Sequence, residues 1–210
     1  MRKLFLGVTL AAAAAAAHAG IVAQATVTCG GNPAGYYNSG GVPTLNVTYS
    51  PAADAGNPGL FWFGLLTPDQ QFANALDITG NWVQYLGGLY PPHKRFDAGL
   101  PGTITVSVPF PADQYGSAPT NTSQFVGYTI YAGHGIYTQQ AAQMVNDRRT
   151  YLNSVKAERQ AKGTWKAAYE DDTQFMWSLV QKDMTDKTKW GAVITVPYID
   201  CAPQDSGGGG

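Results

Sequence analysis

The sequence predicts a mainly β fold: an immunoglobulin-like or related β-sandwich, with a pair of α-helices inserted before the last strand. Three observations carry this prediction. Several short apolar or alternating segments are separated by glycine- and proline-rich turns, as in sandwich proteins. The chain has only two cysteines, Cys29 and Cys201, and they lie near opposite ends of the predicted domain. Residues 138–187 contain almost no glycine or proline and are rich in helix formers.

Residues 1–25 are predicted to form a secretory signal peptide. Two basic residues precede an apolar run over 4–17, and small-residue cleavage sites end at Ala19 and at Ala25. The run is too short to cross about 30 Å of hydrocarbon, which argues against a membrane anchor. We expect cleavage after Ala25, with cleavage after Ala19 as the alternative. The mature protein would then be periplasmic or at the cell surface, and would meet a membrane only through the removed peptide.

Residues 26–201 are expected to form one domain, followed by a flexible tail over 202–210. Removing the first 25 residues leaves 185, which is long enough to bury a core. It also leaves 11 basic residues against 14 acidic ones, a balance that argues against a nucleic-acid partner.

Cys29 and Cys201 are expected to form a disulfide in an oxidising compartment. The loop that it closes is so long that chain entropy allows a stabilisation on the order of 5 kcal/mol. A cysteine-based metal site is the alternative, but it lacks ligands, because the expected mature chain has only two histidines, His93 and His134. We therefore expect neither a metal nor a cofactor.

The strand predictions follow from hydrophobic periodicity. Residues 45–49 alternate apolar and polar side chains, as a half-buried strand requires. Residues 60–66 are apolar throughout, which favours a central strand covered on both faces. The alternation over 103–110 is the cleanest in the chain, and it ends at Pro109, which cannot donate to a ladder and so places the strand end at a sheet edge. Further strands are expected over 82–86, 125–132 and 193–199, and a loop over 30–43.

The segment 138–187 is predicted to form two helices separated at Gly163. In the second helix the inward stripe is expected to consist of four residues, Phe175, Met176, Leu179 and Val180. Trp177 lies outside this stripe at about 100° per residue, so we expect it to be partly exposed to a partner. The alternative places Trp177 between helix and sheet.

Two charged residues, Arg148 and Asp172, interrupt the apolar stripes of the predicted helices. An ion pair between them is one possibility, although counting from Gly163 puts them in different layers and makes Arg159 the nearer partner of Asp172. We favour the interpretation that Asp171 or Asp172 begins the second helix, because acidic residues stabilise helix N-termini.

A set of motifs in the β region resembles a recurrent sandwich module. The segments are 59–64 (GLFWFG), 82–85 (WVQY) with Gly87-Gly88 and Pro91-Pro92, Gly99-Leu100, the strand over 103–110, and 126–135 (VGYTIYAGHG). In this order they are similar to a β-sandwich module of proteobacterial exported and surface proteins, including proteins associated with pili and adhesion. The resemblance covers about residues 45–135 and implies a non-enzymatic surface role. The chain departs from that module by about fifty helical residues after Gly135, so no partner is carried over.

No catalytic signature is present in the sequence. His134, between Gly133 and Gly135, is expected to be a turn residue at a strand end, and no Gly-x-Ser-x-Gly elbow accompanies either histidine. The acidic cluster over 170–172 is better explained by helix capping than by glycoside hydrolysis.

Aromatic and basic residues gather over 82–95 (WVQYLGGLYPPHKR). The aromatic side chains could form a flat platform for a sugar ring or contact a protein partner, and the basic residues after them could donate hydrogen bonds. The candidate binding residues are Trp82, Tyr85, Tyr90, His93 and Arg95. In the alternative, Trp82 and Tyr85 belong to the sandwich core and the basic residues form a solvated loop.

Three functions follow from these observations. The first is a non-catalytic exported interaction module with a protein partner at the cell envelope, for example an accessory of a pilus or adhesion assembly. The second is a carbohydrate-binding domain that uses the aromatic segment 82–95 for a glycan. The third, a periplasmic hydrolase, is disfavoured by the missing catalytic constellation.

Overall fold

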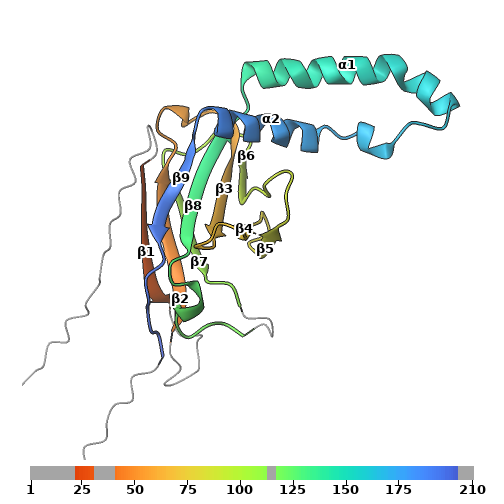
Figure 1. Cartoon of the computed structure of the whole chain (residues 1–210). Helices are drawn as coiled ribbons and strands as arrows, with labels where there is room; N and C mark the ends of the chain where they lie inside the picture. The colour runs from red at the N-terminus through yellow and green to blue at the C-terminus, as the bar shows by residue number, and fades with distance from the viewer. Residues whose placement is uncertain (1–21, 31–40, 113–116, 203–210) are drawn as a thin grey trace, which may run out of the picture.

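The computed structural model describes residues 22–30, 41–112 and 117–202, and shows two antiparallel sheets and two α-helices (Figure 1). The protein is mainly β, and its two sheets pack face to face as in a β-sandwich. Most of the predicted signal peptide, the centre of the predicted loop over 30–43 and nearly all of the predicted tail lie outside the described residues.

The smaller sheet, sheet A, has three strands in the order β1-β2-β7. They are β1 (Val22–Gly30), β2 (Val42–Ser50) and β7 (Ile104–Pro109). The register places Leu45 of β2 between Val27 of β1 and Val108 of β7, so the alternating apolar residues of three strands share one face. The predicted alternation in β2 and β7 is confirmed, and β7 is an edge strand, as Pro109 predicted.

The larger sheet, sheet B, has the order β5-β4-β3-β8-β9, with β6 paired to β3 beside β4. Its strands are β3 (Gly59–Leu66), β4 (Ala73–Leu76), β5 (Trp82–Tyr85), β6 (Lys94–Phe96), β8 (Thr129–Ile136) and β9 (Trp190–Thr195). As predicted, β3 is central and covered on both faces. The strands predicted over 125–132 and 193–199 were displaced: a 3-10 turn at Ser123–Phe125 precedes β8, and β9 begins at Trp190.

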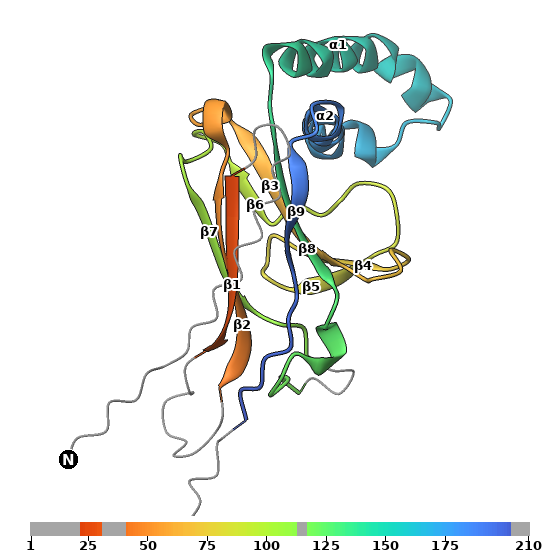
Figure 2. The ribbon, with the colours of Figure 1, turned by 60° about the vertical axis from the view of Figure 1, so that its left-hand side comes forward.

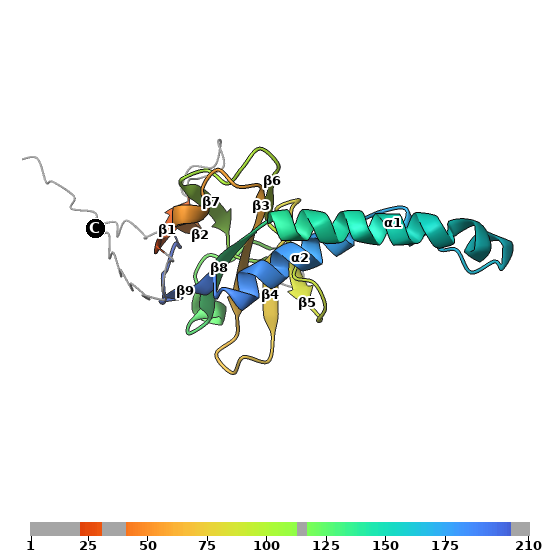
Figure 3. The ribbon, with the colours of Figure 1, turned by 90° about the horizontal axis from the view of Figure 1, so that it is seen from above.

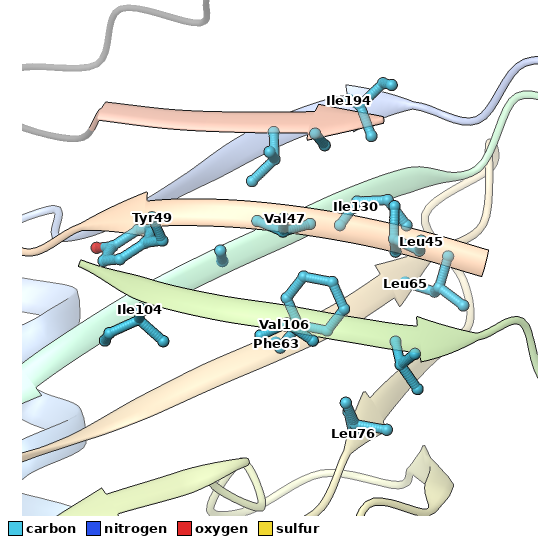
Figure 4. Close-up of a cluster of buried hydrophobic side chains, with 14 of the residues drawn as sticks. Leu45, Val47, Tyr49, Phe63, Leu65, Leu76, Ile104, Val106, Ile130 and Ile194 are labelled. Atoms are coloured by element: carbon cyan, nitrogen blue, oxygen red, sulfur yellow. The ribbon is translucent and has the colours of Figure 1, made fainter. Parts of the chain in front are cut away.

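The main core lies between the two sheets (Figure 4). Because side chains alternate along a strand, Phe61, Phe63 and Leu65 of β3 point toward sheet A, where Leu45, Val47 and Tyr49 of β2 meet them. Strands β7, β8 and β9 add Ile104, Val106, Ile130 and Ile194 to the same layer. The two sheets therefore form the main hydrophobic core between them without side chains from the helices.

The predicted helical pair is present as α1 (Gln139–Ala161) and α2 (Thr173–Asp186), with a 3-10 turn at Ala167–Tyr169 between them. Thr138 caps α1 by accepting the amide N–H of Ala141. Helix α2 lies on the face of sheet B that is opposite sheet A (Figure 2). Helix α1 extends away from the sheets as an arm (Figure 3). Within the described part of the chain, neither helix is long and apolar enough to span a membrane.

Helix α2 docks through a small second core. Val180 and Met184 pack on Leu60 and Trp62, the side chains of β3 that point away from sheet A, and Trp177 packs at the edge of this cluster. The approach is close, since a Cβ at Gly135 of β8 would lie 2.1 Å from the carbonyl oxygen of Val180. Residues 177, 180 and 184 recur at helical spacing and form the sheet-facing stripe.

The predicted orientation of Trp177 was therefore wrong. We expected it outside the inward stripe, but its ring packs against the cluster below α2, as in the alternative between helix and sheet; the side chain is still partly exposed, as expected. Among the described residues, its Nε1 is the one buried side-chain polar atom without a hydrogen-bond partner. Phe175, which was expected to face inward, instead packs against the guanidinium of Arg148, 5.4 Å from its ring centroid.

The ion pair between the helices, which we considered and set aside, is present. The carboxylate of Asp172 binds Arg148, and Arg149 pairs with it as well. Asp172 also directly precedes α2, while Asp171 accepts the amide N–H of Thr173 at 2.8 Å. Counting from Gly163 failed because the second helix does not begin there: a 3-10 turn at Ala167–Tyr169 intervenes, and α2 begins only at Thr173.

The predicted disulfide between Cys29 and Cys201 is confirmed, with the two Cα atoms 5.4 Å apart. Strand β1, which carries Cys29, begins at Val22, and its first four residues pair with Tyr49 and neighbouring residues of β2. Cleavage after Ala25 would remove these four residues. Of the two predicted cleavage sites, only the one after Ala19 leaves β1 whole.

Candidate functional site

Helix α2 covers only part of the outer face of sheet B and leaves an open groove beside it, with a volume of about 270 Å³. The floor consists of small residues on two neighbouring strands. Gly64 of β3 pairs with Ala75 of β4, and Ala73, two residues before Ala75, points to the same face. Since Phe63 and Leu65 point into the core, Gly64 faces outward. The groove exists because these outward positions carry almost no side-chain volume.

Two pairs of aromatic rings form the walls of the groove. On one side, Tyr85 at the end of β5 stacks on Tyr90 of the following loop, with ring centroids 4.3 Å apart and planes 24° apart. On the other side, Tyr131 of β8 contacts Trp190, the first residue of β9, at 5.5 Å. Because the sheet order is β5-β4-β3-β8-β9, the two pairs lie on either side of the floor. Met184 and Trp62 close the end beside α2.

The Tyr90 wall is fixed by groups from two other elements. Its amide N–H donates to Oε1 of Gln181 on α2 at 2.7 Å, and its carbonyl oxygen accepts from Nε1 of Trp62 at 2.9 Å. The chain reverses before it through Gly87 and Gly88, whose φ angles of 106° and 88° suit glycine. The ring is therefore held in place before any ligand arrives, which reduces the entropic cost of binding.

None of the described residues that line the groove is charged. Burial, with Tyr90 close by, raises the pKa of Tyr85, whose hydroxyl donates to the carbonyl oxygen of Gly88. The surface continues into a second hollow lined in part by Phe72 and Leu86, of which Leu86 is 85% exposed. We call Phe72, Leu86 and Trp190, all exposed, the apolar rim. Aromatic enrichment without charge is typical of the centre of a protein interface.

The structure brings together two of the predicted site residues, Tyr85 and Tyr90, and separates the others. Trp82 packs on Phe63 at the other face of the sheet and donates its Nε1–H to Pro109 at 3.0 Å. His93 is half-buried, with Nδ1 3.1 Å from the carbonyl oxygen of Asp77.

The other two predicted residues also lie outside the groove. Arg95 is exposed and pairs with Asp97, and Trp177 lies under α2. The sequence reasoning missed Trp62, Tyr131 and Trp190 as groove residues. Tyr131 and Trp62 were visible as aromatic residues on predicted strands, but only the pairing of β3, β8 and β9 brings them to Tyr85.

A second cluster of polar groups lies at the other end of β8. His134 is within β8 and only 3% exposed, so its predicted position in a turn at the strand end was wrong. Its Nδ1 lies 2.5 Å from the hydroxyl of Tyr49, and its Nε2 2.8 Å from a carboxylate oxygen of Asp54. Lys189 bridges Asp54 and Asp183 at 2.6 Å each. Asp183 also accepts the amide N–H of Ile136, so the network ties α2 to β8.

Burial favours the neutral form of His134. Burial lowers the pKa of His134, although Asp54 acts in the opposite direction, and burial with the nearby Asp54 charge raises the pKa of Tyr49. The matching tautomer has Tyr49 donating to Nδ1 and Nε2–H donating to Asp54. Tyr49 and His134 are buried, whereas Asp54, at the outer end of this Tyr-His-Asp arrangement, is 21% exposed. The network fixes α2 and the start of β9, and thereby the groove wall.

Within the described residues there is no group of three or more His, Cys, Asp or Glu side chains placed to hold a metal ion. Comparison of the chain with protein-family models, curated proteins and solved structures gave no significant match.

Proposed function

We propose that the protein is a non-catalytic exported interaction module, and that the groove on sheet B binds a protein partner at the cell envelope or surface. The observation that carries this proposal is an uncharged, aromatic-walled groove held open beside α2 and continuous with an exposed apolar rim. Contiguous exposed apolar surface marks interaction sites in soluble proteins. The Cys29–Cys201 disulfide fits an oxidising compartment, and the sequence resemblance favours a surface role, for example as an accessory of a pilus or adhesion assembly.

Site-specific photo-crosslinking tests this proposal directly. A photoreactive amino acid at Leu86, on the rim, is expected to give a defined adduct with one protein when the chain is exported in its native host. The same amino acid at Tyr151, which is exposed on the arm α1, is the control. An adduct at Leu86 that disappears when Ala75→Leu fills the groove supports the proposal. Absence of an adduct at Leu86, or equal adducts at both positions, contradicts it.

A carbohydrate ligand is the second candidate, and one observation favours it. Tyr90 is exposed beside Tyr85, so an aromatic platform is present on one face, as a sugar-binding site requires. Against it, the groove offers few polar side chains for hydroxyl groups. Binding on a glycan array that is abolished by Tyr90→Ala would favour the carbohydrate over the protein partner.

A further inference from the structure

Pockets for drug-sized ligands have volumes of roughly 300–1,000 Å³. The groove alone has about 270 Å³, which is large enough for one ring, and the second hollow beside Phe72 and Leu86 adds about 450 Å³ for the rest of a larger molecule. Its floor at Gly64, Ala73 and Ala75 is flat and lacks protruding side chains. The size and the floor together suit a flat group inserted from a larger molecule that rests on the rim.

The chemistry of the walls restricts that group further. Tyr85 and Tyr90 on one side, and Tyr131 and Trp190 on the other, present ring faces and edges, which pair favourably with another aromatic ring. Apart from the tyrosines and the two tryptophan indoles, Gln70 and Thr185 are the lining residues that can offer a polar side chain, since Asn74 is paired with the core residue Leu65 and points to the other face. A charged group would be desolvated there without a partner, at a large cost in free energy.

Resting on the proposed function, we infer that the groove receives a single uncharged aromatic side chain that the protein partner presents as its anchor. Interfaces commonly concentrate their binding energy in one such anchor at the centre, surrounded by contacts that exclude water. Here the rim residues Phe72 and Leu86 supply the surrounding contacts. Gln181 acts as a positioning residue, since it holds the backbone of Tyr90 without lining the groove.

Titration with small probes, followed by NMR of the tryptophan indole N–H signals, tests the inference on the full-length mature protein. Indole and N-acetylphenylalanine amide are expected to shift the Trp190 and Trp62 signals in a saturable way. Each probe supplies the ring without the rim contacts, so its Kd is expected in the millimolar range. Methyl β-D-glucoside is expected to cause no saturable shift.

Matched variants connect the shifts to the groove. Ala75→Leu should weaken indole binding by about tenfold or more, because its side chain occupies the floor. Ala73→Leu is the second filling variant should Ala75→Leu not fold. Ala168→Leu adds the same atoms at an exposed site outside the groove and should leave binding unchanged.

The remaining outcomes separate this inference from the proposed function. Saturable glucoside binding without indole binding would overturn the aromatic anchor. Micromolar indole binding would overturn the assignment to a side chain, since the free molecule would then be the ligand. Failure of every probe would also overturn the anchor, while an adduct at Leu86 that Ala75→Leu removes would leave the proposed function standing. Suppression of this adduct by excess indole would support both the proposed function and the aromatic anchor, because the free ring and the protein partner would then compete for the groove.

Discussion

Replacing Lys189 with methionine removes the charge that joins two buried parts of the polar network. The ammonium group lies 2.6 Å from Asp54 and from Asp183, and the Lys189 and Asp183 side chains are only 13% and 6% exposed. Removing one partner of a buried ion pair costs about 3–5 kcal/mol. Asp54 is 21% exposed and each carboxylate keeps another partner, so we expect Lys189→Met to lower the free energy of unfolding by about 2–3 kcal/mol at pH 7. Urea unfolding followed by tryptophan fluorescence measures it.

Lys187→Met is the matched control. Lys187 pairs with the same Asp183 at 2.7 Å, but its side chain is 56% exposed, so the expected loss is below about 1 kcal/mol. A loss for Lys189→Met no larger than that for the control would refute the reasoning.

The pH dependence gives an independent check on Lys189. Burial acts to raise the pKa values of Asp54 and Asp183, but hydrogen bonds from Lys189 and the other partners outweigh it and lower both. Groups of this kind stabilise the fold above their unfolded pKa of 3.8, and the contribution is lost as the pH falls through the folded pKa. Without Lys189 the lowering is smaller, so the difference between the two proteins should narrow from pH 7 to pH 3. A difference that is constant over this range would contradict the assignment.

Three further predictions follow from the described geometry. Replacing Cys29 and Cys201 with serine should lower the free energy of unfolding by up to about 5 kcal/mol, because the disulfide closes a loop with a sequence separation of 172, and urea unfolding checks this. Mass spectrometry of the exported protein should find a chain that begins directly after Ala19, since this keeps β1 whole; a chain that lacks the first half of β1 would contradict it. Gln181→Ala should weaken indole binding several-fold with little change in unfolding, because it frees the loop over 86–93 without altering the groove lining.

The sequence predicted those elements whose burial pattern can be recognised within the element itself. The alternation over 103–110 and the apolar run over 60–66 became β7 and β3, because burial of every second residue, or of all, leaves a direct trace in the sequence. The helices were predicted from periodicity in the same way. Strands β4 and β6 were missed because they have four and three residues and owe their conformation to pairing with β3. Half of β1 was assigned to the signal peptide, since small apolar residues suit both.

Only one wall of the groove was open to sequence reasoning. Tyr85 and Tyr90 lie five residues apart, so a loop of glycines brings them together. The facing pair comes from β8 and β9, which are far apart in the sequence and meet only through the register of sheet B. The floor at Gly64 and Ala75 could not be recognised either, because small residues in a strand are also typical of places where another backbone packs closely.

The disulfide changes how the domain responds to mechanical load. A force that pulls on residues 22 and 202 travels along β1 to Cys29, crosses the sulfur–sulfur bond and leaves through Cys201. Almost the whole sandwich and both helices lie in the bypassed loop, so such a force can peel β1 from β2 but cannot stretch the segment between the cysteines. Under such a force only the short segments outside the two cysteines can extend, and the groove, which lies within the bypassed loop, carries no load.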